Sequence, residues 1–212
     1  MKKIILILFL FPLVSLGQEN INYQKPSKEI LELLEFDRPP TVLYDDQKKF
    51  MIFLYRDNYK SIKDLSIKEL RLGGLRIDPK TNIGSRITYY NNVKIKNIKD
   101  RKSKINQILG LPDNAKLSNI VWSPDQKKIA LTNTTENGVE LWLMKLETGT
   151  VVKLTEPNLN ANVGDVINWF NDSESMLVKK ISKNREELID TKNIVPKGPT
   201  ISSNAGEKAQ NR

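Results

Sequence analysis

The sequence contains no cysteine and no histidine among its 212 residues. Without cysteine there are no disulfide bonds, thiolate nucleophiles or cysteine-based zinc sites, so packing and hydrogen bonds must stabilise the fold. Without histidine the chain lacks the usual general base of serine hydrolases. It also has no Gly-x-Ser-x-Gly elbow, no Ser-x-x-Lys pair and no glycine-rich phosphate loop. We therefore expect no catalytic residue, no metal site and no cofactor in this chain.

The amino terminus has the pattern of a secretory signal. Two lysines precede the apolar run 4–14, and the small residues Ser15 and Gly17 follow it. An uncleaved anchor is the alternative, but the run is short of the roughly twenty residues that span a membrane. We expect cleavage after residues 1–17, export to the periplasm or the extracellular space, and no membrane anchor afterwards.

The formal net charge of +9 raises the possibility of a nucleic-acid partner. However, the basic residues are scattered along the chain, and no nucleic-acid-binding motif is present. The densest basic group, 94–104, alternates with apolar residues, as one strand face of a half-buried hairpin does. We expect no nucleic-acid partner.

The stretch from Trp122 to Glu156 and the residues just before it contain four apolar segments separated by turn signals. Ser-Pro-Asp-Gln, Asn-Gly and Glu-Thr-Gly are sequences that favour tight turns. The predicted strands are 118–122, 129–133, 139–146 and 150–154. Four antiparallel strands in so short a stretch are typical of one β-propeller blade.

The pattern recurs after about 47 residues, near the upper end of the range for blades. Trp169 then matches Trp122, and Asp172 matches Asp125. Upstream, the hairpin 93–105 resembles the later one, with Ile98 opposite Leu146. Repetition matters because a blade buries its two faces only against neighbouring blades.

A third copy of the turn occupies 44–50 and is one residue shorter when Asp46 is matched to Asp125. Its distance from the second copy implies an insertion of about thirty residues, at about 58–89. The dipeptides Gly73-Gly74 and Asp78-Pro79 within that insertion favour loop structure.

These observations predict an all-β fold, a partial β-propeller of about two and a half four-stranded blades. A linker and a short helix, capped by Ser27 and running to about Phe36, would occupy 18–40. The partial propeller would occupy 41–182. The polar composition of 183–212 predicts an irregular, loop-rich tail.

Several blocks resemble the amino-terminal part of secreted prolyl-oligopeptidase-like serine peptidases, most closely their glutamyl endopeptidase branch. The most specific block is "ELRLGGLRIDPKTN" (69–82), and "GLPDNAKLSNIVWSPD" (110–125) and "TNTTENGVELW" (132–142) also match. The resemblance implies a propeller joined to an α/β-hydrolase domain that lies beyond Arg212. Gln126 departs from the pattern, because blade turns usually have glycine there.

If the propeller restricts access of peptides, three arginines of the insertion are candidate substrate-binding residues: Arg71, Arg76 and Arg86. Guanidinium groups bind carboxylates in bidentate fashion and would attract an acidic peptide. The alternative is a structural ion pair with Glu69 or Asp78.

The resulting hypothesis is a non-catalytic propeller portion that gates or scaffolds peptide access to a hydrolase domain absent from this chain. Its partners would be the peptide substrates of that domain. The rival hypothesis is a self-standing exported propeller that binds a protein or cell-envelope partner without any enzymatic role.

Overall fold

The computed structural model describes residues 25–185, and the chain separates into two compact units, Met1–Asp37 and Arg38–Arg212. The first unit contains helix α2 (Lys28–Leu34), which buries none of its residues. Ser27 is the N-cap residue as predicted, but its side chain makes no capping hydrogen bond. The proposed signal and most of the polar tail lie outside the described residues.

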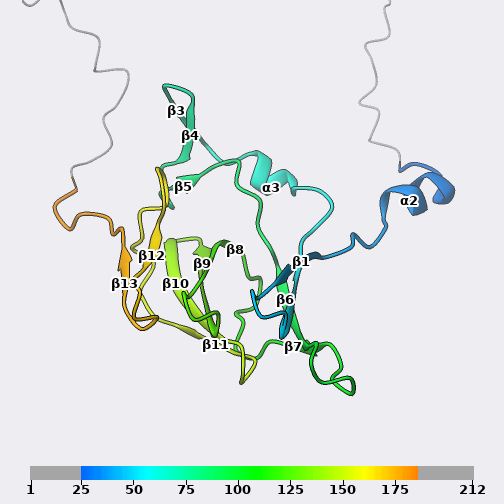
Figure 1. Ribbon diagram of the computed structural model, residues 1–212. Coiled ribbons are helices and arrows are strands. Elements are labelled where there is room, and N and C mark those ends of the chain that lie inside the picture. Colours follow the sequence, from blue (N-terminus) through cyan, green and yellow to red (C-terminus); the bar gives the residue numbers. More distant parts are fainter. Residues whose placement is uncertain (1–24, 186–212) are drawn as a thin grey trace, which may run out of the picture. The chain divides into compact units, whose positions relative to one another are not determined.

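The second unit begins with a four-stranded antiparallel sheet in the order β1-β2-β6-β7 (Figure 1). Its strands are β1 (Thr41–Tyr44), β2 (Phe50–Tyr55), β6 (Asn92–Asn97) and β7 (Asn106–Gln107). Every second residue of β2 is buried, which is the alternation of a strand with one face in a core.

The stretch with the clearest turn signals forms a second four-stranded antiparallel sheet, in the order β11-β10-β9-β8. Its strands are β8 (Leu117–Trp122), β9 (Lys128–Thr135), β10 (Gly138–Lys145) and β11 (Thr150–Lys153). All four strands predicted for this stretch are confirmed. Short turns join them into an up-and-down meander, which is the topology of one propeller blade.

A third, two-stranded sheet consists of β12 (Ile167–Trp169) and β13 (Met176–Val178). The indole N–H of Trp169 donates to the backbone oxygen of Val121 at 3.2 Å, which ties this sheet to β8. Together the three sheets confirm the predicted all-β, partial propeller of about two and a half blades.

Two apolar clusters join the sheets face to face. Consecutive residues of β9 enter different clusters: Ile129 packs between the first and second sheets, and Ala130 packs toward the third. The two tryptophans at equivalent positions of the repeat show the same arrangement, since Trp122 packs on the first cluster and Trp169 on the second. The second sheet is therefore buried on both faces, as an inner blade must be.

The first sheet is interrupted in sequence, because β2 pairs directly with β6 and Tyr55 faces Asn92. The intervening insertion contains α3 (Ile62–Leu65) and a small antiparallel sheet in the order β3-β4-β5. The strands of this sheet are β3 (Leu70–Leu72), β4 (Leu75–Asp78) and β5 (Ile83–Gly84).

The insertion differs from the loop that its dipeptides predicted. Gly73 and Gly74, both at positive φ, form the tight turn between β3 and β4, and Asp78 is the last residue of β4. Ile83 of β5 is buried in the cluster shared by the second and third sheets. This anchor explains why the segment folds back onto the blades as ordered structure.

The predicted repeat of the blade turn is present three times, with one correction. Each turn closes when the fourth residue donates its backbone N–H to the first residue: Lys48 to Asp45, Gln126 to Ser123, and Ser173 to Phe170. The fourth residue is at positive φ in all three turns, at 50°, 61° and 58° respectively.

The first turn is therefore not one residue shorter, as the match of Asp46 to Asp125 suggested. Asp45 takes the place of Ser123, and its side-chain oxygen accepts the backbone N–H groups of Lys49 and Phe50. The sequence match failed because it paired two aspartates, Asp46 and Asp125. The hydrogen bonds instead make Asp45 equivalent to Ser123.

We predict that Lys48→Gly stabilises the protein, whereas Gln47→Gly destabilises it. A side chain at positive φ is strained and glycine is not, so a gain of about 0.5–1 kcal/mol is expected at position 48. Gln47 is not among the residues at positive φ, so glycine there only adds flexibility to the unfolded chain. Denaturant unfolding of both variants measures the difference, and the reverse order would contradict the corrected alignment.

Candidate functional site

Three strand ends meet where the insertion leaves the first sheet and returns to it. Arg38 comes just before β1 and Arg56 just after β2, and the pairing of Thr41 with Leu54 brings these two ends together. Asn91 precedes β6 and donates its backbone N–H to the oxygen of Tyr55 at 2.8 Å. The antiparallel pairing thus gathers polar residues that are far apart in sequence.

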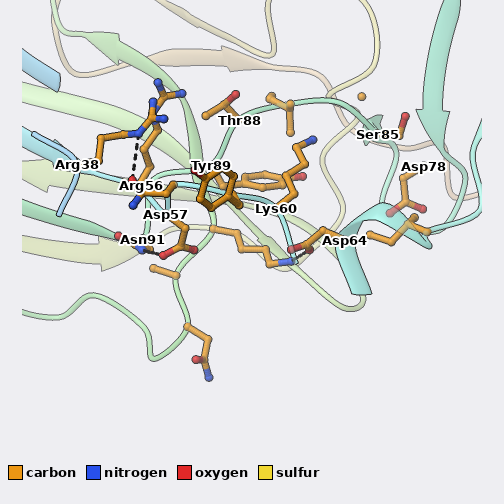
Figure 2. Close-up of a pocket in the computed structure, with 18 residues that line it drawn as sticks. Arg38, Arg56, Asp57, Lys60, Asp64, Asp78, Ser85, Thr88, Tyr89 and Asn91 are labelled. Carbon is orange, nitrogen blue, oxygen red and sulfur yellow. Dashed lines mark hydrogen bonds and ion pairs between the residues drawn. The ribbon is translucent and has the colours of Figure 1, made fainter. Parts of the chain in front are cut away.

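A cavity of about 460 Å³ lies at this edge, between the blades and the insertion. Figure 2 shows Arg38, Arg56, Asp57 and Asn91 at one end, and Ser85 and Asp78 at the other. The full lining comprises Arg38, Arg56, Asp57, Asn58, Tyr59, Lys60, Asp64, Ile67, Asp78, Gly84, Ser85, Ile87, Thr88, Tyr89, Asn91, Asn114, Ala115 and Lys116. Its volume is within the usual range for small-ligand pockets.

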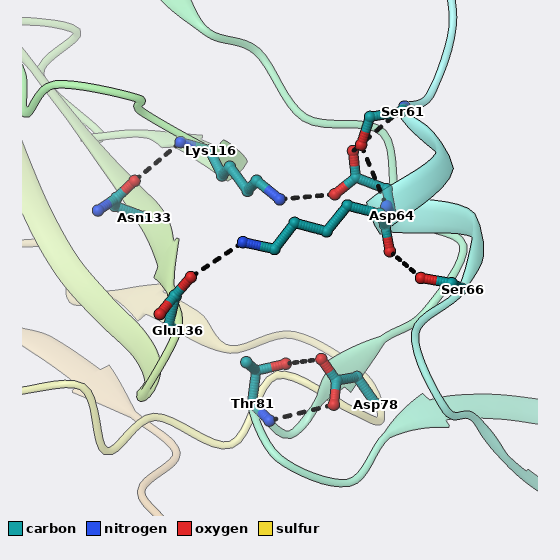
Figure 3. Close-up of polar contacts among 9 residues, drawn as sticks. Ser61, Asp64, Ser66, Asp78, Thr81, Lys116, Asn133 and Glu136 are labelled. Carbon is teal, nitrogen blue, oxygen red and sulfur yellow. Dashed lines mark hydrogen bonds and ion pairs between the residues drawn. The ribbon is translucent and has the colours of Figure 1, made fainter.

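The insertion is held to the second blade by two ion pairs (Figure 3). Lys116, just before β8, contacts Asp64 of α3 at 2.7 Å, and Lys63 contacts Glu136 in the β9–β10 turn at 3.1 Å. Ser61 and Asp64 also form a reciprocal capping box at the start of α3. These contacts place α3 beside the cavity.

Two pKa shifts follow from this arrangement. The hydrogen bond from the Lys116 ammonium, with that from Ser61, lowers the pKa of Asp64, so this carboxylate is ionised at neutral pH. Burial raises the pKa of Tyr89 at the cavity wall, and the nearby charges of Asp78 and Asp64 act in the same direction. Tyr89 therefore remains a neutral phenol.

The structure places two of the three arginines expected to bind substrate around a single carboxylate. Arg71 and Arg76 both pair with Glu69, at 2.9 and 2.5 Å, and Ser85 donates its hydroxyl to the same side chain at 2.8 Å. Arg86 is exposed, and no ion pair involves it in the described part of the chain. The alternative of a structural ion pair with Glu69 thus describes Arg71 and Arg76.

The Glu69 cluster shifts the acidity of that carboxyl group strongly. The hydroxyl of Ser85 contributes most, and the guanidinium groups of Arg76 and Arg71 add to it, lowering the pKa of Glu69 to about 2. Sequence reasoning had not singled out the cations that do line the cavity, which are Arg38, Arg56, Lys60 and Lys116. Arg38 and Arg56 could have been identified only from their positions next to two paired strands. Those positions are known only once the register of β1 and β2 is known.

Residues 25–185 contain no cluster of three or more acidic, histidine or cysteine side chains suited to a metal ion. No helix in this range is long and apolar enough to cross a membrane. The polar groups that line the cavity are cations, carboxylates, amides, hydroxyls and phenols.

The chain that builds this cavity is related in sequence to peptidases. It is 29% identical over 202 residues to a probable chloroplastic glutamyl endopeptidase of Oryza sativa subsp. japonica, across 89% of this chain and 21% of the relative. The corresponding protein of Arabidopsis thaliana is 30% identical over 192 residues, across 86% and 20%. The chain thus spans about one fifth of the length of these curated relatives.

Solved peptidase structures also match, with low TM-scores and low sequence identity. The Pyrococcus horikoshii acylaminoacyl peptidase has a TM-score of 0.40 and 18% identity, across 76% of this chain and 20% of its own. An acylaminoacyl peptidase in complex with Z-Gly-Gly-Phe-chloromethyl ketone has a TM-score of 0.38 and 18% identity, across 74% and 20%. No family model matches the chain. The fold assignment rests on the strand pairing described above.

We predict that Glu69→Gln lowers the thermal unfolding temperature at pH 7, with a smaller effect as the solution is acidified. A carboxyl group whose pKa is about 2 in the folded protein and 4.5 otherwise stabilises the fold above pH 4.5. That stabilisation is lost as the pH falls from 4.5 toward 2, where the native side chain also becomes neutral.

Glu35→Gln is the matched control, because Glu35 is exposed and has no ion pair among the described residues. Thermal melts of both variants and the parent chain at several pH values between 7 and 3 give the comparison. A deficit of the Glu69 variant that stays constant over this range would refute the assigned role of the cluster.

Proposed function

We propose that this chain forms the propeller portion of an exported, prolyl-oligopeptidase-like serine peptidase and controls which peptides reach a hydrolase domain. One observation carries the proposal: sequence relationship to glutamyl endopeptidases extends over 86% to 89% of the chain. A self-standing binding module would not require such a relationship along nearly the whole sequence.

The blade arrangement supports a gating role. In a propeller the strand ends open toward the faces of the ring, where a neighbouring domain and its substrates approach. Here one group of strand ends carries the insertion and the cavity beneath it. Residues that line such an entrance can discriminate between peptides by charge and size before a peptide bond is hydrolysed.

The chemistry of the side chains supports a non-catalytic role. Serine hydrolysis requires a base that takes the proton from the nucleophile and returns it to the leaving amine. The full sequence has no histidine and no Ser-x-x-Lys pair that could do this. Ser85, the nearest approach to a serine elbow, donates its hydroxyl to Glu69 and so serves the ion-pair cluster.

We predict that the chain alone hydrolyses no peptide bond. The assay uses fluorogenic peptides that contain acidic residues or proline, with a serine-directed covalent inhibitor as control. A chimera in which this chain replaces the matching region of the Arabidopsis relative should hydrolyse the same peptides. Its preference among short and long peptides should differ from that of the relative lacking this region.

Two results would oppose the proposal. Inhibitor-sensitive turnover by the purified chain would refute the non-catalytic assignment. A chimera that is active but selects peptides as the shortened relative does would refute gating. Replacing Ser123 with alanine in the chimera is the matched control, since Ser123 is buried in a blade turn and should leave peptide selection unchanged.

A further inference from the structure

The insertion exposes large apolar side chains on two of its elements. Tyr59, Ile62 and Leu65, in α3 and just before it, are 64%, 86% and 71% exposed. Leu72 and Leu75, at the turn between β3 and β4, are 56% and 44% exposed. Such a gathering of exposed apolar groups on one segment marks a surface that contacts a protein or a membrane. We call these five residues the outer surface of the insertion.

The β3–β4 turn projects away from the rest of the described chain. Leu72 pairs with Leu75 across the register, and Gly73 and Gly74 lie between them at positive φ. A methyl group placed on either glycine would meet no atom within 4 Å outside the adjoining residues. Figure 1 shows this hairpin and α3 beyond the same end of the blades. The apolar groups therefore lie on projecting elements, which enter a soft surface more readily than they form a closely packed interface with a folded protein.

The insertion is basic, and its acidic groups already have partners. Residues 58–89 contain seven lysine and arginine residues against three acidic ones, a net charge of +4. Asp64 is held by an ion pair with the second blade, Asp78 by a threonine hydroxyl and Glu69 by two arginines. Lys68, between α3 and β3, forms no ion pair with any described residue. The field of the insertion toward solvent is therefore positive.

We propose that the outer surface of the insertion binds the face of a lipid bilayer that contains anionic lipids. Leu72 and Leu75 enter the boundary between headgroups and acyl chains. Ile62 and Leu65 of α3 enter it beside them, and the lysines and arginines of the insertion contact the anionic headgroups. Aliphatic side chains next to basic ones are typical of segments that lie in this boundary. The contact is peripheral and is therefore consistent with the predicted lack of a membrane anchor.

The composition of this surface favours a bilayer over a nucleic acid. Proteins bind single-stranded nucleic acids through aromatic side chains on which bases stack. Tyr59 is the only aromatic residue among the exposed large apolar side chains of the insertion, and the others are isoleucines and leucines. Aliphatic side chains cannot stack on bases, whereas burial among acyl chains stabilises them. The insertion therefore matches the chemistry of a lipid surface.

This inference goes beyond the proposed function, since a lipid surface is not a substrate of a peptidase. It places the cavity close to the membrane, because Tyr59 of the outer surface also lines the cavity. The test below uses no peptide and involves no hydrolysis. A negative result would leave the selection of peptides intact, and vesicle binding does not depend on peptide selection.

The experiment measures co-sedimentation of the purified chain with two kinds of vesicle. One consists of phosphatidylcholine alone, and the other of phosphatidylcholine with about one third phosphatidylglycerol, which is anionic. The anionic vesicles should bind the chain at least about tenfold more tightly, since each lysine or arginine near an anionic surface adds about fivefold in affinity. Raising the salt concentration should weaken this binding, because salt screens the charges.

Two sets of variants separate the outer surface from exposed groups elsewhere. Leu72→Gln combined with Leu75→Gln should lower affinity for anionic vesicles by at least about tenfold, because two apolar side chains no longer enter the bilayer. Leu177→Gln is the matched control, since Leu177 is 61% exposed on β13, outside the insertion. Lys68→Gln should lower affinity by about fivefold, whereas Lys145→Gln, at the exposed end of β10, should leave it unchanged. The thermal unfolding temperature of every variant shows whether the fold is retained.

A fluorescent label locates the contact directly, because the chain contains no cysteine of its own. Leu72→Cys and Leu177→Cys each offer a single thiol for a nitrobenzoxadiazole group, whose emission rises and shifts to shorter wavelength in an apolar medium. The label at position 72 should respond to anionic vesicles, and the label at position 177 should not. This comparison holds even if the apolar run 4–14 is retained and enters the bilayer itself.

Four results would overturn the proposal. The first is no binding to anionic vesicles, or equal binding to both kinds of vesicle. The second is an equal loss of affinity in the double leucine variant and the Leu177→Gln control. The third is a label that responds at position 177 as strongly as at position 72. The fourth is tighter binding to a single-stranded oligonucleotide than to anionic vesicles at equal ionic strength, because that result identifies a nucleic-acid site.

Discussion

The structure depends on the burial of both faces of the second sheet. Ile129 and Met144 point to one side, and Ala130 and Leu141 point to the other, so this sheet is stable only between two neighbours. Each large apolar side chain buried in this way contributes about 1.5–3 kcal/mol. The two ion pairs that hold α3, one exposed and one half-buried, contribute little by comparison. Apolar contact therefore fixes the blades and anchors the insertion through Ile83, and the ion pairs add a second, weaker attachment of the insertion.

The difference between the blades and the insertion also separates the arginines into two groups. Arg71 and Arg76 lie on the small sheet of the insertion, whose strands need a local counter-charge, and Glu69 supplies it. Arg56 lies at the end of a blade strand, where the rigid register of β2 and β6 determines its position. A cation on a rigid support is better suited to recognise a ligand than one that shares a carboxylate with a neighbour.

Much of the fold follows from the sequence, because turn residues and alternating apolar residues are local signals. The blade from Leu117 to Lys153 was predicted strand by strand, and the equivalence of Ile98 and Leu146 holds, since each donates its backbone N–H to a lysine of the neighbouring turn. The alignment at Asp45 failed because an aspartate can take the role of a serine in a turn. The cavity was not predictable from local signals, because it exists only once β1, β2 and β6 are paired and the start of β8 lies beside them.

The pairing of β2 with β6 across the insertion also has a kinetic consequence. The strands of the second sheet meet through tight turns, so their contacts close small loops at low entropic cost. The first sheet must bring Tyr55 to Asn92 over the whole inserted segment before its inner pair can form. Proteins with more distant contacts fold more slowly. The second blade is thus the natural nucleus on this chain, and the first blade, with the cavity at its edge, assembles upon a surface that the second has already made.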